Sequence, residues 1–195
     1  MIERFNALKP GPESISALLS FEDWQKGQLR KKGYAPWSSP NQENIEEMLR
    51  GEIKIVVDLP RPAAFQLDPS LFNPLASEIA VNTGSFLLNR TDDKLFSEQR
   101  QIQKERTRVL GIERTRIELL DTLSSIYIIL KHYIETGKNL VGRNFIRTAT
   151  PNDGLHLIDV GDFDTKRKEL HVNQLLRNDK SSLIWLPNIA VPVKA

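Results

Sequence analysis

Apolar residues recur at steps of three and four positions between residues 117 and 134, which is typical of a helix with one buried face. The members of this stripe are Ile117, Leu120, Leu123, Ile126, Tyr127, Leu130 and Ile134. We therefore expect this part of the chain to pack into a hydrophobic core.

A polar segment, residues 97–108, precedes the stripe, and Ile102 is its only apolar member. A helical pattern nevertheless runs through both parts, from a capping Thr91 to a glycine stop at Gly137. The pattern predicts one long central helix over about 92–136. Because a helix that is polar on all sides is not held by burial in its own chain, we expect its first half to project into solvent or to lie against a polar partner.

The first third of the chain is rich in proline, since eight of the eleven prolines lie within its first 74 residues. Proline interrupts helices and sheets, so an irregular structure is expected there. Capping and glycine signals predict two short helices, near 20–33 and 39–51, and loose alternation predicts a strand over 52–59. An apolar stripe then predicts a further helix over about 75–90.

The C-terminal part contains short apolar runs bounded by turn residues, and they predict strands over 155–160 and 183–186. Between them, the pattern fits either a helix over 166–177 or a strand over 169–172. The segment 187–195 is apolar and extended by its prolines, and it is too short to form a core of its own.

Together these elements predict an α+β fold that is predominantly helical. It consists of the long central helix (about 92–136), short N-terminal helices with one strand, and a small β-containing C-terminal region. Whether the helix is continuous through Gly111 is left open by the pattern. We expect two units, a helical domain over 1–147 with an irregular Pro-rich beginning, and an α/β appendage over 148–195 with an extended tail.

Composition excludes several classes of protein. The 195 residues include 27 Lys and Arg against 25 Asp and Glu, a formal charge of +2, so the chain as a whole is not a histone-like nucleic-acid binder. It contains no cysteine, which excludes disulfides, thiolate nucleophiles, zinc fingers and iron–sulfur clusters. The N-terminus shows no secretory signal, and the densest apolar run is too short to span a bilayer, so we expect a cytoplasmic protein without a membrane partner.

Positive charge is concentrated in one segment, residues 100–116. Against Glu105 and Glu113 it holds six basic residues, a local sum of +4: Arg100, Lys104, Arg106, Arg108, Arg114 and Arg116. Spacing of four residues aligns the first, second and fourth of these along one helix face. Such a stripe suits the phosphate backbone of duplex nucleic acid, an acidic partner protein, or plain solvation with internal ion pairs. Its lack of aromatic residues argues against stacking on single-stranded bases.

Carboxylates and imidazoles gather in the C-terminal part, as Asp153, Asp159, Asp162, Asp164, His156 and His171. These residue types bind divalent cations, although their spacing does not match an EF-hand loop and Asp is common in turns. No signature of a hydrolase, kinase, dehydrogenase or metalloprotease occurs. We therefore expect no cofactor, no metal and no enzymatic activity.

Three functions follow from these patterns. The first is a non-enzymatic subunit of a multi-subunit or homo-oligomeric assembly, which binds partner proteins through its exposed helix and its tail residues Ile189, Val191 and Val193. The alternative is a duplex nucleic-acid-binding subunit that uses the basic stripe 100–116. The third is a metal-dependent enzyme that uses the cluster Asp153–Asp164.

Overall fold

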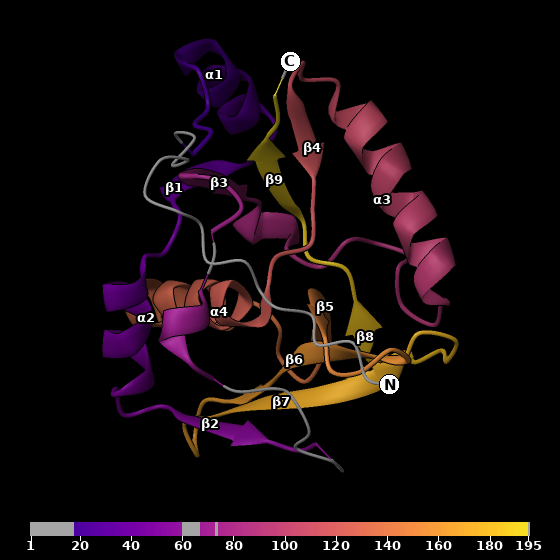
Figure 1. Cartoon of the computed structure of the whole chain (residues 1–195). Helices are drawn as coiled ribbons and strands as arrows, with labels where there is room; N and C mark the ends of the chain where they lie inside the picture. Colours follow the sequence, from indigo (N-terminus) through magenta and orange to yellow (C-terminus); the bar gives the residue numbers. More distant parts are fainter. Residues whose placement is uncertain (1–17, 60–66, 73, 195) are drawn as a thin grey trace, which may run out of the picture.

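Two β-sheets organise the chain in the computed structural model, which describes residues 18–59, 67–72 and 74–194 (Figure 1). The helices are α1 (Asp23–Lys31), α2 (Gln42–Leu49), α3 (Phe96–Leu110) and α4 (Thr122–Thr136), with two short 3-10 helices, η1 (Pro69–Leu71) and η2 (Thr83–Ser85). The strands are β1 (Ala35–Ser38), β2 (Lys54–Val57), β3 (Glu78–Val81), β4 (Thr115–Ile117), β5 (Phe145–Pro151), β6 (His156–Asp164), β7 (Glu169–Leu176), β8 (Ile184–Trp185) and β9 (Ile189–Pro192).

The first sheet has the strand order β1-β3-β9-β4, and all its pairs are antiparallel. The second sheet has the order β2-β7-β6-β5-β8, with an antiparallel centre and a parallel strand at each edge. Each sheet therefore joins strands that are far apart in the sequence.

Helix α4 lies between the two sheets and carries the main hydrophobic core (Figure 1). Its Ile128 and Ile129 are fully buried, and they belong to the same cluster as Val81 of β3, Ile158 of β6 and Ile189 of β9. The prediction that the apolar stripe of residues 117–134 packs into a core is confirmed for most of its members, whereas Tyr127 is half-buried and Ile134 is exposed.

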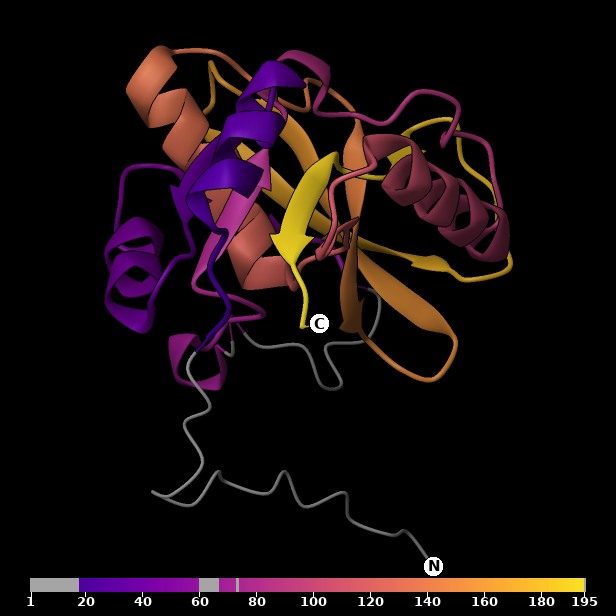
Figure 2. The same ribbon diagram turned by 90° about the horizontal axis from the view of Figure 1, so that it is seen from above.

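A second apolar cluster covers the other face of the first sheet. It joins Leu29 of α1 and Leu110 at the end of α3 to Ala80 of β3 and Ala190 of β9. The first sheet is thus buried on both faces, because the side chains of β3 and β9 alternate between the two clusters. Figure 1 and Figure 2 both place α3 at one side of the molecule and α2 at the other.

The predicted long central helix over about 92–136, whose continuity through Gly111 the sequence left open, is two separate helices in the structure. Helix α3 ends at Gly111, which has a φ of 60° and forms a left-handed C-cap. Strand β4 follows, and α4 starts only after Asp121, whose side chain accepts a hydrogen bond from the Ser124 N–H at 2.9 Å. The helix end predicted at Gly137 is confirmed, since that residue has a φ of 70°.

The predicted fold class, predominantly helical α+β, is also wrong, because several segments expected to be helical form strands instead. The structure is α+β, with four helices (31% helical) and 28% strand in two sheets across the described residues. The helix expected over 75–90 is replaced by β3 and η2, and the helix over 166–177 by β7, in agreement with the strand alternative. The two short N-terminal helices and the strand within 52–59 are confirmed as α1, α2 and β2.

Strand pairing crosses the boundary between the two expected units, 1–147 and 148–195. The boundary lies inside β5, β7 pairs with β2, and β9 pairs with both β3 and β4. The second segment therefore contributes strands to both sheets instead of forming an appendage. Among the described residues, no helix is both long enough and apolar enough to cross a bilayer.

Candidate nucleic-acid interface

Polar side chains hold α3 against the rest of the molecule. The buried amide of Gln103 donates a hydrogen bond to the Ile117 carbonyl of β4 at 3.0 Å, and the Thr107 hydroxyl accepts one from the Ile117 N–H at 2.9 Å. Gln99, also buried, donates to the Ile184 carbonyl at 3.2 Å. A largely polar helix is thus docked in its own chain, because its amides and hydroxyl satisfy backbone groups of neighbouring strands while Phe96 and Leu110 at its ends pack in the second apolar cluster.

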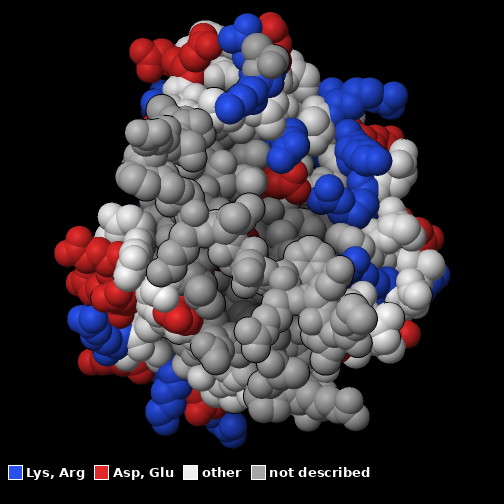
Figure 3. Space-filling model, in the orientation of Figure 1, with Lys and Arg blue, Asp and Glu red and all other residues white. Residues whose placement is uncertain are grey.

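This docking turns one basic flank of α3 outward. Arg100, Lys104 and Arg108 follow one another at steps of four along the helix. Arg116 joins them from β4, where it is exposed between two buried neighbours. We call these four residues the basic face. Figure 3 shows Lys and Arg atoms gathered at the upper right of the molecule, where Figure 1 places β4 and α3.

Glu118 fixes two of the four cations. Its Oε1 lies 3.1 Å from Arg100 Nη1 and its Oε2 lies 2.9 Å from Arg116 Nε, and the Leu119 N–H donates to Oε1 at 3.0 Å. The Glu118 side chain is 14% exposed, whereas those of Arg100 and Arg116 are 39% and 49% exposed. A largely buried carboxylate therefore positions two guanidinium groups that still face solvent.

The basic face carries an excess of positive charge. Among the described residues, one carboxylate, that of Glu118, forms ion pairs with its four cations, so the paired groups sum to +3. Lys104 and Arg108 form no ion pair with any residue in the described part of the chain. Their charges are consequently available to an external anion.

The structure separates the other two predicted basic residues from this face. Arg106 is two residues from Lys104, so it lies on the other side of α3, where it is half-buried. Arg114 lies in the turn before β4, and it forms ion pairs with Glu22 at 3.5 Å and Glu113 at 3.8 Å. The six predicted residues thus occupy three different places.

The expected partner-binding tail has a different role in the structure. Ile189 and Val191 are 0% and 1% exposed, because β9 lies between β3 and β4 with both faces covered. Val193 follows β9, is half-buried, and donates its N–H to the Arg114 carbonyl at 2.9 Å. This segment completes the protein's own sheet, so Ile189 and Val191 offer no surface to a partner in this fold.

The predicted metal-ligating residues are dispersed. Asp153 binds His156 Nδ1 at 2.8 Å, and this hydrogen bond, with two backbone N–H groups, lowers the pKa of the Asp153 carboxyl. Asp164 accepts backbone hydrogen bonds in the turn after β6, and His171 pairs with Asp58 at 3.1 Å. Within the described ranges, no three or more potential ligands come together as a metal site.

Asp159 instead forms a buried pair with Arg147, a residue that sequence reasoning did not single out. The Arg147 Nε and Asp159 Oδ1 atoms are 3.8 Å apart, and the two residues are 0% and 1% exposed. Burial raises the pKa of Asp159 to about 7, although the Arg147 charge lowers it, and burial lowers the pKa of Arg147. In the sequence, the signal for this pair is the position of Asp159 inside the apolar run Leu157–Val160, since a charge among buried residues needs a partner.

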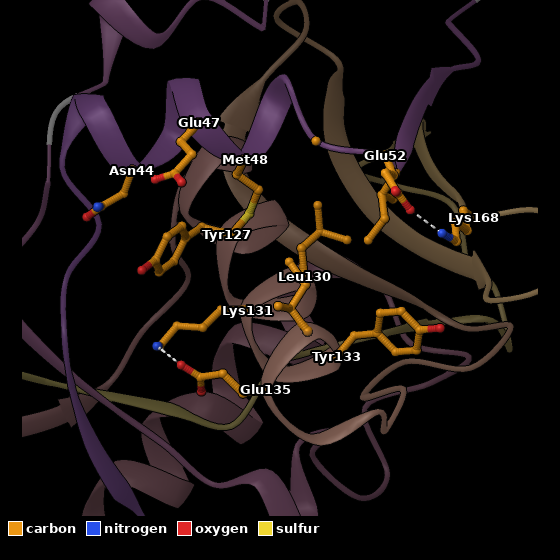
Figure 4. A pocket seen from close by; sticks show the side chains of 13 residues that line it. Asn44, Glu47, Met48, Glu52, Tyr127, Leu130, Lys131, Tyr133, Glu135 and Lys168 are labelled. Atoms are coloured by element: carbon orange, nitrogen blue, oxygen red, sulfur yellow. Dashed lines mark hydrogen bonds and ion pairs between the residues drawn. The ribbon is translucent and has the colours of Figure 1, made fainter.

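A hollow of about 570 Å³ lies between α2 and α4 (Figure 4). Met48 and Leu130 contribute apolar lining, and the charged groups at its rim include the ion pairs Glu52–Lys168 and Lys131–Glu135. The hydrogen bond within the first pair lowers the pKa of Glu52 and raises that of Lys168. Both lysines of this hollow are therefore neutralised within the chain, unlike Lys104 and Arg108 on the basic face.

Comparisons with known proteins add no relative. No protein-family model matches the sequence, and no curated protein and no solved structure is significantly similar to the chain.

Proposed function

We propose that this protein binds duplex nucleic acid through the basic face of α3 and β4. The observation that supports this most is Glu118, which holds Arg100 and Arg116 in place beside two cations that pair with no residue in the described part of the chain. Phosphate contacts from Arg and Lys supply most of the sequence-independent affinity for duplexes. A preorganised pair of guanidinium groups favours such contacts, since less side-chain freedom is lost on binding.

The dimensions of the basic face suit a duplex. Arg108 follows Arg100 by eight positions, which corresponds to about 12 Å along a helix axis. The major groove of B-DNA is also about 12 Å wide, so the two ends of the face can reach phosphates on both of its sides. Segment 97–116 contains no aromatic residue, which favours backbone contacts over base stacking. We place this activity in the cytoplasm, as the sequence predicts.

The two other functions stay predictions. The arguments for an assembly subunit were a polar helix and an apolar tail, and both have a role inside the chain, as the docked α3 and as β9. A metal-dependent enzyme lacks a gathered ligand set among the described residues. The basic face thus has the most direct support.

The test is duplex binding by a variant with two charges removed, Lys104→Gln/Arg108→Gln. We expect fluorescence anisotropy with a short DNA duplex to show salt-dependent binding by the wild type. The slope of log K against log salt should become less steep by about 1.8 in the variant, because two phosphate contacts are lost.

A matched control removes the same charge from another helix, Arg30→Gln/Lys31→Gln in α1, where both residues are exposed. This variant should keep the wild-type slope. No binding by the wild type at about 50 mM salt, or equal slopes for all three proteins, would contradict the proposal.

A further inference from the structure

Arg106, the basic residue on the other side of α3, lies between two adjoining hollows. The larger, of about 630 Å³, is lined partly by residues of the turn before α3, among them Arg90, Asp92 and Lys94. The smaller, of about 230 Å³, is lined by α3, the turn that follows α1 and the loops around β3 and β9. Arg106 and Val109 line both hollows, so the two hollows adjoin at these side chains, and we refer to the two together as the depression.

The smaller hollow is positively charged. Among the residues that the structure describes, its charged lining residues are Lys32 and Arg106, and none is a carboxylate. Neither cation forms an ion pair with a residue that the structure describes. A half-buried guanidinium group without a counter-charge is costly, and an anion from solution would relieve that cost.

Polar groups in the wall of the smaller hollow are held in fixed positions. The Tyr34 hydroxyl donates to Asn188 Oδ1 at 2.5 Å, and Asn188 Nδ2 donates to the Ser85 carbonyl at 3.1 Å. Asn82 Nδ2 donates to the Lys32 carbonyl at 3.4 Å. Burial raises the pKa of Tyr34, against the effects of the Asn188 hydrogen bond and the Arg106 charge, so its hydroxyl stays neutral at physiological pH.

We propose that this depression binds a small phosphorylated molecule, whose phosphate lies in the smaller hollow between Lys32 and Arg106. A guanidinium group matches phosphate oxygens with two parallel N–H donors, and an exposed Lys adds a mobile charge at the entrance. The larger hollow, with charged residues of both signs, accommodates the polar remainder of the molecule. The site is separate from the basic face, because Arg106 points to the opposite side of α3.

The experiment titrates the protein with two probes, inorganic phosphate and glycerol 3-phosphate, at constant ionic strength, and follows ³¹P NMR line width and the melting temperature. We expect at least one probe to bind and to raise the melting temperature. Lys32→Gln should raise the Kd at least about tenfold, since a charge-assisted contact is lost. Lys54→Gln, a change at an exposed position of β2, should leave the Kd unchanged.

Lys32→Gln distinguishes loss of the binding site from a folding defect, because Lys32 is exposed and its replacement spares the fold. Arg106→Gln, in contrast, removes a half-buried side chain and is expected to lower stability as well. Failure of both probes to bind at about 10 mM, or equal affinity in the wild type and Lys32→Gln, would overturn the proposal. If phosphate still binds to the variant Lys104→Gln/Arg108→Gln, the phosphate site is independent of the basic face. If that variant no longer binds phosphate, the two sites are not independent.

Discussion

Arg147 and Asp159 occupy paired positions on β5 and β6, and both side chains are excluded from solvent. Removing two such charges from water costs several kcal/mol for each ion, and mutual attraction offsets this only with close contact and further hydrogen bonds. Here the nearest atoms are 3.8 Å apart, and the guanidinium nitrogens have no hydrogen-bond partner among the described residues. The pair therefore strains the protein electrostatically, as the raised pKa of Asp159 shows.

The first prediction concerns the pH dependence of stability. The pKa of Asp159 rises from 3.8 to about 7 on folding, so between these values the folded protein holds a proton that the unfolded chain has lost. The stability contributed by this group is complete below pH 4 and falls as the pH rises to 7. Asp159→Asn should remove this fall in stability with pH. Between pH 4 and 8, the free energy of unfolding of the variant should therefore rise by up to about 4 kcal/mol relative to that of the wild type, as measured by urea unfolding.

Asp153 provides a control, because its effect on stability changes with pH in the opposite direction. Hydrogen bonds lower the pKa of Asp153, so its contribution is present at neutral pH and is lost on acidification. Asp153→Asn should therefore lower stability at pH 7 and have less effect near pH 3. If the stability difference between Asp159→Asn and the wild type is the same at every pH, the raised pKa of Asp159 is ruled out.

At the scale of the element, α3 shows what a hydropathy pattern omits. Its position inside the predicted range 92–136 could be read from the sequence, because the helical pattern and the acidic first turn are local signals. The docking of α3 could not be read from the sequence, because Gln99 and Gln103 are polar residues of a type that usually faces solvent. Their burial depends on backbone groups of β4 and β8, which local sequence does not reveal.

The second prediction tests this docking. Gln103→Leu keeps the volume of the side chain but leaves the buried Ile117 carbonyl without its amide donor. We expect a loss of about 1–3 kcal/mol in the free energy of unfolding. Gln101→Leu, on the exposed side of the same helix, should change stability by less than about 0.5 kcal/mol. Equal effects in urea unfolding would show that the amide contacts do not hold the helix.

The break between α3 and α4 was missed because the apolar residues fit two periods. Ile117 and Leu119 alternate as in a strand, while Leu120 and Leu123 continue a helical stripe. Hydrogen bonds decide between the two, since Ile117 pairs with Ala190 in β9. The division of the six basic residues follows from this break, because only the strand brings Arg116 beside α3. Local signals sufficed for α1, α2 and β2, which have caps or turn residues at their ends.

On the scale of the whole molecule, β9 connects the two cores. Ile189 and Val191 face the cluster shared with α4, and Ala190 faces the cluster shared with α1 and α3. Its hydrophobic sequence suggested a tail for a partner, because short apolar segments near prolines look unable to bury themselves. The strands that receive it, β3 and β4, are distant in sequence.

The third prediction is that shortening a buried side chain of β9 destabilises the isolated protein. Ile189→Ala should cost about 2–5 kcal/mol, because it opens a cavity beside α4. Ile134→Ala, which alters an exposed side chain of α4, should cost far less. If Ile189→Ala instead alters oligomeric state in sedimentation experiments at unchanged stability, the segment acts as a partner-binding tail after all.

The central place of β9 has a consequence for protein synthesis. On the ribosome, β4 has no partner in its sheet and one edge of β3 stays unpaired until residues 189–192 have been translated and have left the exit tunnel. Native closure of the first sheet is therefore a late event, which requires contacts between distant segments. Meanwhile the nascent chain exposes two open strand edges and part of its core, a state in which chaperones would be expected to engage it.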